Sequence, residues 1–221
     1  MYPGDGALVL PLDLWRSPRH GDETVVTRCL GPTLDVGCGP GRMVHAVAAN
    51  GVPALGIDIS PLAVEQARAR GASALRRDVF GPLPAVGRWH HVLLIDGNIG
   101  IGADPAALLR RCREFLQGDG TVLVELEPSR AGVSTGTLRL VADGVVSLPL
   151  PWARVGADAI GHVARSAGMY IVDRWTEGGR AFAELRVRWR RHPAAAKHHS
   201  AAAPKPAIPH SRACVPTWMD T

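Results

Sequence analysis

Short apolar runs alternate with stretches of helical periodicity from residue 33 to about residue 191, and this alternation restricts the fold more than any other feature. The apolar runs lie at 33–36, 53–59, 73–79, 90–96 and 121–128. Helical stretches at 42–50, 62–70 and 105–116 separate most of them. Strands separated by helices form a parallel sheet with helices on both faces, so we predict an α/β protein.

Helix starts are marked by capping residues. Ser60 and Asp104 each precede a proline, which is the pattern of an N-cap followed by proline at the first helical position. Gly118 is predicted to end the helix that begins after Asp104.

The last part of the alternating region has a different pattern. A helix is predicted at 156–168, and 169–175 and 180–189 are predicted to pair as antiparallel strands across "TEGG". The segment 137–150 has the pattern of a β-hairpin that turns at Asp143-Gly144. We therefore predict a three-layer α/β sandwich with a mostly parallel seven-stranded sheet, an antiparallel last strand and a small inserted β-hairpin.

The composition divides the chain into a folded body and a tail. Residues 1–191 form the predicted domain, in which 1–30 are an N-terminal lid or helix and 137–150 are the inserted hairpin. Residues 192–221 lack periodicity and are rich in alanine, proline and histidine, so we predict a disordered tail.

The positive charge does not indicate a polyanion-binding surface. The whole chain has a formal charge of +5, but residues 1–191 hold 22 arginines and 19 acidic residues, a difference of only +3. A body so near balance argues against a nucleic-acid partner. Arginine in place of lysine, amid alanine, glycine and proline, is typical of a GC-rich bacterial genome.

Cysteine spacing and hydropathy indicate a cytoplasmic protein without a metal site. Cys29, Cys38, Cys112 and Cys214 are not spaced as zinc ligands or as a CxxC pair, so we expect reduced thiols and no metal. The N-terminus lacks the basic region of a signal peptide, and no apolar run approaches the roughly 20 residues of a membrane span. We predict no membrane partner.

The stretch "LDVGCGPGR" at 34–42 joins the first predicted strand to its helix. Gly37, Gly39 and Gly41 remove side chains from this turn, so a ligand can approach the backbone. A dinucleotide-binding turn requires G-x-G-x-x-G, and Arg42 occupies the position of its third glycine.

The spacing G-x-G-x-G, with Asp35 two residues before the first glycine, resembles motif I of the class I S-adenosylmethionine-dependent methyltransferases. The resemblance covers residues 22–190, because further acids follow at the ends of successive strands: Asp58 in "GIDIS", Asp78 in "RRDVF" and Asp96 in "LLIDGNIG". It implies a Rossmann-like methyltransferase domain with S-adenosyl-L-methionine as cofactor.

The resemblance also implies a role for each of these motif residues. The turn of Gly37, Cys38 and Gly39 would lie against the cofactor, with Asp35 near its ammonium group. Asp58, followed by Ile59, would accept hydrogen bonds from the ribose hydroxyls. Asp78 would contact the adenine amino group, with Val79 against the ring. Asp96 would lie where the methyl group and the acceptor meet.

The catalytic base is left unassigned by the sequence. Positioning alone can lower the activation free energy by about 7–11 kcal/mol, whereas a general base lowers it by roughly 3–5 kcal/mol. Methyl transfer therefore does not require a general base. Asp96 and His20 are candidates, Asn98 is a possible acceptor contact or turn residue, and Trp15 and Trp152 are possible walls of the acceptor pocket.

We predict a methyltransferase that acts on a small-molecule substrate, because "DGNIG" differs from the Asn/Asp-Pro-Pro-aromatic motif of enzymes that methylate nucleobase or glutamine amino groups. Three alternatives stay open: a nucleic-acid methyltransferase that uses the tail, a non-catalytic cofactor-binding or interaction protein of the same fold, and a dinucleotide-dependent oxidoreductase. The oligomeric state is not predicted.

Overall fold

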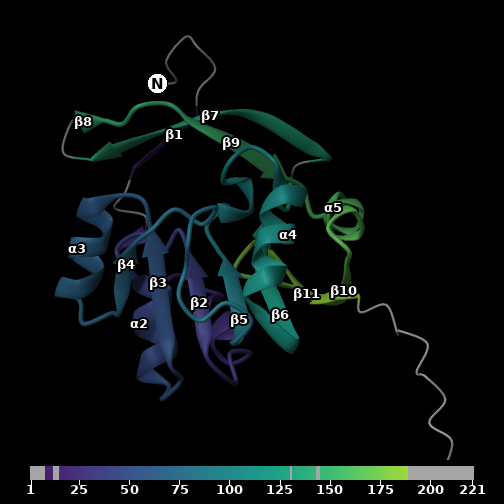
Figure 1. The fold of residues 1–221 in the computed structure, drawn as a ribbon. Coiled ribbons are helices and arrows are strands. Elements are labelled where there is room, and N and C mark those ends of the chain that lie inside the picture. Colours follow the sequence, from purple (N-terminus) through teal and green to yellow (C-terminus); the bar gives the residue numbers. More distant parts are fainter. Residues whose placement is uncertain (1–7, 12–14, 130, 143–144, 189–221) are drawn as a thin grey trace, which may run out of the picture. The chain divides into compact units, whose positions relative to one another are not determined.

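The computed structural model describes residues 8–11, 15–129, 131–142 and 145–188. Seven strands form the main sheet in the order β10–β11–β6–β5–β2–β3–β4 (Figure 1). They are β2 (Thr33–Val36), β3 (Ala54–Asp58), β4 (Ala74–Arg76), β5 (Trp89–Leu94), β6 (Leu116–Leu126), β10 (Met169–Glu177) and β11 (Arg180–Val187). The strands from β2 to β6 pair in parallel, and β11 is antiparallel to both of its neighbours. The predicted fold class is confirmed.

The described residues form five α-helices, of which two begin at the predicted caps. They are α1 (Asp22–Val26), α2 (Arg42–Ala49), α3 (Pro61–Ala69), α4 (Pro105–Phe115) and α5 (Ile160–Ser166), with a 3₁₀ turn, η2, at Asn98–Gly100. Ser60 and Asp104 accept hydrogen bonds from the third residue after them, as N-caps do. The predicted end at Gly118 is wrong, because Leu116 already has an extended backbone and begins β6.

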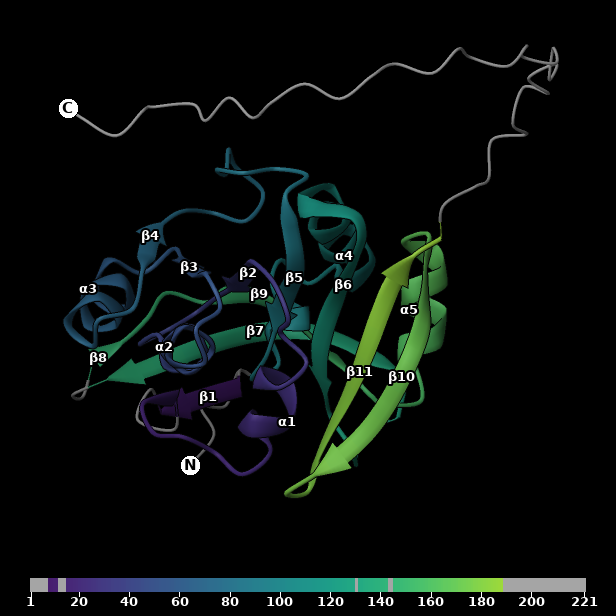
Figure 2. The same ribbon diagram turned by 90° about the horizontal axis from the view of Figure 1, so that it is seen from below.

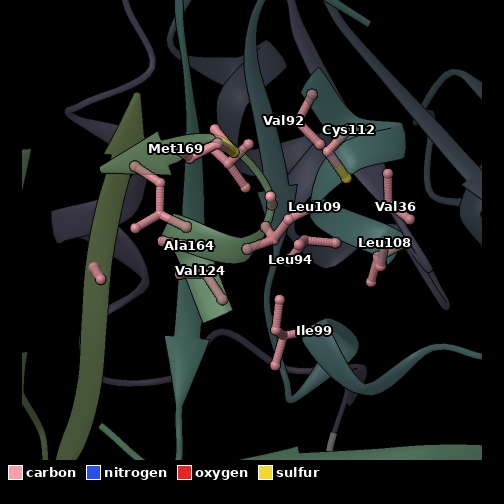
Figure 3. Packing of buried hydrophobic residues seen from close by; sticks show 14 of the residues in the cluster. Val36, Val92, Leu94, Ile99, Leu108, Leu109, Cys112, Val124, Ala164 and Met169 are labelled. Carbon is pink, nitrogen blue, oxygen red and sulfur yellow. The ribbon is translucent and has the colours of Figure 1, made fainter. Parts of the chain in front are cut away.

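The helices cover both faces of the main sheet, and the side chains of β5 alternate between them. Helices α4 and α5 lie on one face of the sheet, and α1 and α2 lie on the other (Figure 2). Val92 and Leu94 pack with residues of α4 and α5, whereas Leu93 packs with residues of α1 and α2. Figure 3 shows Val92 and Leu94 beside Leu109 and Cys112 of α4. A strand that is apolar on both faces belongs in the middle of a covered parallel sheet, where β5 lies.

A second, smaller sheet lies across the carboxyl ends of the parallel strands (Figure 1). It consists of β1 (Leu8–Pro11), β7 (Val133–Ala142), β8 (Val145–Val146) and β9 (Leu150–Val155). The predicted hairpin at 137–150 thus forms part of a larger unit, although its turn at 143–144 lies outside the described residues. The predicted lid or helix at 1–30 contains α1, but it also contributes β1, which pairs in parallel with β7.

The tail predicted at 192–221 lies outside the described residues. Within the described ranges, the longest helices fall short of the length and apolar character that crossing a membrane requires.

Candidate active site

A cavity of about 300 Å³ opens between the carboxyl ends of the parallel strands and the second sheet. Parallel strands place the residues that follow them at one edge, so acids distant in sequence meet there. All nine residues predicted for the cofactor site line this cavity: Asp35, Gly37, Cys38, Gly39, Asp58, Ile59, Asp78, Val79 and Asp96.

The glycine turn after β2 requires its glycines. Gly37, Gly39 and Gly41 have φ values of 71°, 51° and 80°, a left-handed conformation that other residues adopt only with strain. A β-carbon on Gly39 would have the ring of Trp15, at 4.0 Å, as its nearest neighbour, so the backbone there faces open space. The turn therefore presents bare backbone to the cavity. The thiol of Cys38 packs instead against Gly56 of β3.

Asn98 holds this turn in place. Its amide Nδ2 donates hydrogen bonds of 2.9 Å to the carbonyl oxygens of both Val36 and Gly37, and the residue is buried. A β-carbon on Gly37 would lie only 2.8 Å from that nitrogen, so glycine is also required for this contact. Of the two roles the sequence left open for Asn98, the described contacts are those of a turn residue.

Asp35 is a buried carboxylate at the end of β2. It is 3% exposed, and no described residue donates a hydrogen bond to its side chain. Burial, reinforced by the negative charge of Asp96, raises the pKa of Asp35 to about 7 although Arg42 opposes the shift. A carboxylate so poorly stabilised is suited to a cationic partner from outside the protein.

Asp58 and Asp78 are held by backbone groups. The carboxylate of Asp58 accepts hydrogen bonds from the N–H groups of Gly39 at 2.9 Å and Ser60 at 2.8 Å, yet burial still raises its pKa. The carboxylate of Asp78 accepts from the N–H of Phe80 at 2.9 Å and is exposed. Each carboxylate oxygen can accept a second hydrogen bond, so both residues keep acceptor capacity toward the cavity.

Two large apolar side chains remain exposed beside these acids. Ile59 is 52% exposed and Phe80 is 46% exposed, and both line the cavity, whereas Val79 is buried. Exposed apolar side chains that line a cavity are typical of a site for a ligand with an apolar part.

Asp96 is fixed by a buried ionic network. Its backbone has a left-handed φ of 57°, and its N–H donates to Glu125 Oε2 at 2.7 Å. Its carboxylate is paired with Arg42 and, at 2.6 Å, with Arg19. A carboxylate with a guanidinium on each oxygen is held in one position by the protein.

The same network continues away from the cavity. Arg180 donates to both oxygens of Glu125 at 2.8 Å and to Asp22 at 2.8 Å, and Arg42 pairs with Asp22. Burial alone would raise the pKa of Asp22, but the hydrogen bonds from Arg42 and Arg180 hold it below its ordinary value.

The amino-acid sequence alone did not predict this network. Arg42 breaks the dinucleotide pattern and Asp96 is predicted only as a cofactor-site residue or a base, while the other members lie in segments with no motif. The one available signal was that Glu125 and Arg180 interrupt apolar strand sequences, where a charged residue needs a partner.

The described histidines do not line the cavity. His20 lies 3.0 Å from Glu177 near the β10–β11 turn and does not line the cavity. His91 pairs with Thr33 at the amino ends of the strands, the opposite edge of the sheet. The described side chains include no group of three or more histidine, cysteine or acidic residues that could hold a metal ion.

The second sheet supplies the opposite wall of the cavity. Trp15 and Trp152 both line it, as predicted for aromatic walls. The other lining residues of this sheet are Leu138, Leu150 and Pro151, so the wall is apolar.

Comparison with known proteins identifies the fold. Residues 33–120 match the family model described as a methyltransferase domain. No curated protein matches the chain in sequence.

Solved structures match over most of the chain. An S-adenosylmethionine-dependent methyltransferase from Bacteroides fragilis, in complex with S-adenosyl-L-homocysteine, is 22% identical with a TM-score of 0.70, over 81% of this chain and 83% of that chain. The 1,6-didemethyltoxoflavin-N1-methyltransferase of Burkholderia thailandensis is 16% identical with a TM-score of 0.53, over 71% and 70%. The glycopeptide N-methyltransferase MtfA, complexed with S-adenosyl-L-methionine, is 17% identical with a TM-score of 0.57, over 75% and 92%.

The fold is therefore that of the Rossmann-like methyltransferases. The predicted resemblance to the class I S-adenosylmethionine-dependent family is confirmed by the domain match at 33–120 and by these structures.

Proposed function

We propose that the protein is an S-adenosylmethionine-dependent methyltransferase that acts on a small molecule. The observation that carries the proposal is the convergence of the glycine turn and four strand-end carboxylates on one cavity. Structures with the same fold contain S-adenosyl-L-methionine or its demethylated product, and one contains the small molecule 1,6-didemethyltoxoflavin.

The residues present fit this cofactor. The backbone at Gly39 leaves open space, the buried carboxylate of Asp35 lacks a hydrogen-bond donor among the described residues, and Ile59 and Phe80 expose apolar surface. The Nε of Arg42 is buried without a hydrogen-bond partner in the described part of the chain. These features provide acceptors for an ammonium group and hydroxyls, apolar contacts for a base and one donor for a carboxylate.

Charge favours the sulfonium cofactor over a dinucleotide. Four carboxylates and two guanidiniums line the cavity, so its side chains have a net negative charge when all are ionised. A pyrophosphate group would approach Asp35, and the two anions would repel each other. A cofactor with a sulfonium and an ammonium group is instead attracted by the negatively charged lining.

The chain's own contribution to the reaction is positioning. The cofactor supplies an activated methyl group whose leaving group is a neutral thioether. Asn98 holds the glycine turn, and Arg19 and Arg42 hold Asp96, so the groups around the reacting atoms are fixed before substrate binds. The second sheet covers one side of the cavity with apolar side chains. Such preorganisation supplies the largest part of the rate enhancement in a displacement of this kind.

Calorimetric titration with S-adenosyl-L-methionine, S-adenosyl-L-homocysteine and NADH tests the proposal. We expect binding of the first two, and we expect Asp58→Ala to weaken it by about 1.5–3 kcal/mol, which is roughly 10- to 150-fold in Kd. Asp119→Ala is the matched control, because Asp119 is exposed and does not line the cavity. Binding of NADH without either adenosyl compound would reject the proposal, and an unchanged Kd would remove Asp58 from the site.

A further inference from the structure

The second-sheet wall of the cavity differs chemically from the wall formed by the strand ends. The strand ends provide all four lining carboxylates, whereas the second sheet provides Leu138, Leu150, Pro151 and Trp152. These four side chains include no charge, and the indole N–H of Trp152 is their one polar group. A charged molecule placed against this wall would lose hydration without gaining a partner from it.

Trp152 is held in a fixed position within this wall. Its backbone forms an antiparallel bridge with Ile101. A β-carbon on Gly100 would lie 2.7 Å from the indole Nε1 and 2.9 Å from Cδ1, so the ring lies directly on the backbone of η2. Because its backbone and one edge of its ring are both held in place, the indole presents a preformed flat surface.

Further aromatic and apolar groups extend this surface. Trp15, 4.0 Å from the position of a β-carbon on Gly39, and Ile101, 3.1 Å from that of a β-carbon on Gly37, continue the lining toward the glycine turn. Flat aromatic side chains favour a flat ligand, because stacking adds to the burial of apolar area.

We propose that the acceptor is an uncharged, planar aromatic or heteroaromatic molecule that binds against Trp152. The indole of Trp152 thereby determines the specificity for the acceptor. This inference rests on the proposed function and adds the substrate class. The carboxylates on the facing wall support an uncharged acceptor, because they repel molecules with an anionic group. The apolar wall disfavours a charge of either sign.

Binding to the protein loaded with S-adenosyl-L-homocysteine tests the inference without requiring turnover. The probes are 2-naphthol, which is uncharged at neutral pH, and 2-naphthoate, which has the same ring system with a carboxylate. We expect 2-naphthol to bind at least about tenfold more tightly than 2-naphthoate to the wild-type protein. Equal binding of the two probes, or tighter binding of 2-naphthoate, would overturn the inference.

Variants test whether Trp152 provides the surface on which 2-naphthol binds. Trp152→Leu should weaken 2-naphthol binding by about tenfold or more, Trp152→Phe should weaken it less, and Tyr170→Leu, on the edge strand β10, is the matched control. Binding of S-adenosyl-L-homocysteine should stay unchanged in all three, which also shows that each variant is folded. If Trp152→Leu left the 2-naphthol affinity intact, the inference would be wrong. Failure of the wild-type protein to bind S-adenosyl-L-homocysteine would instead contradict the proposed function.

Discussion

The pKa of Asp35 makes cofactor affinity depend on pH in a predictable direction. Burial and the charge of Asp96 raise this pKa to about 7, so at pH 6 the carboxyl group of the ligand-free protein is mostly protonated. On the proposed function, Asp35 faces the ammonium group of the cofactor and must be ionised to bind it. Binding therefore releases a proton at pH 6, and affinity rises as the pH rises toward neutrality.

The size of the effect follows from linkage. If only the ionised form binds, the apparent Kd is multiplied by 1 + 10^(pKa − pH), which is about 11 at pH 6 and about 1.3 at pH 7.5 for a pKa of about 7. The affinity for S-adenosyl-L-methionine should thus increase roughly eightfold across this interval. The interval ends at pH 7.5 because an α-amino group titrates at about 7.7–8.0 and would reverse the trend.

Calorimetry in two buffers with different ionisation heats measures both the affinity and the number of protons released. We expect close to one proton released at pH 6 by the wild-type protein. Asp35→Asn should bind more weakly and show neither the pH dependence nor the proton release. The same slope in the wild-type protein and in Asp35→Asn would refute the reasoning, as would proton uptake on binding.

The same shift affects the stability of the ligand-free protein, with the opposite sign. A raised carboxyl pKa means that the folded state holds a proton that the unfolded state loses near pH 4. This contribution to stability is fully present below about pH 4 and is lost as the pH rises through about 7. From this group alone, the ligand-free protein should be less stable at pH 7.5 than at pH 5, and Asp35→Asn should reduce that difference.

Two further predictions concern residues that hold the site. Arg180→Met leaves Glu125 buried without its cation and leaves Asp22 with Arg42 alone, so chemical denaturation should show a loss of about 3–5 kcal/mol in unfolding free energy. Arg110→Met, in an exposed pair, should lose less than about 1 kcal/mol, and equal losses would contradict a buried network. Asn98→Ala removes both side-chain hydrogen bonds to the carbonyl groups of Val36 and Gly37 and should cost about 1–3 kcal/mol while weakening cofactor binding, whereas unchanged binding would show that the turn needs no such support.

The positions of the acids could be predicted because they follow from local pattern and topology together. A parallel sheet brings the residue after each strand to one edge, so locating the strands also locates Asp35, Asp58 and Asp78. The caps at Ser60 and Asp104 were predictable for a similar reason, since each cap is a contact within three residues.

The contacts that fix the site could not be predicted in this way. Arg180 meets Asp22 across 158 positions and Glu125 across 55, and no local pattern records which of many arginines a buried carboxylate will find. The pairing of β1 with β7 has the same character, because parallel partners need a long connection and leave no turn sequence between them.

The buried network and the cavity are parts of one electrostatic arrangement. Arg19, Arg42 and Arg180 are paired with Asp22, Asp96 and Glu125, so their positive charge is balanced within the protein. Asp35 and Asp58 are left with backbone donors or with none, and burial raises the pKa of both. On the proposed function, this residual negative potential attracts a sulfonium cation and loses part of its hold once the methyl group has left, because the product sulfur is neutral. If every arginine were instead paired with a cavity carboxylate, this negative potential would be absent. The protein would then bind the cofactor and its product equally well, and it would release the product no more readily than the cofactor.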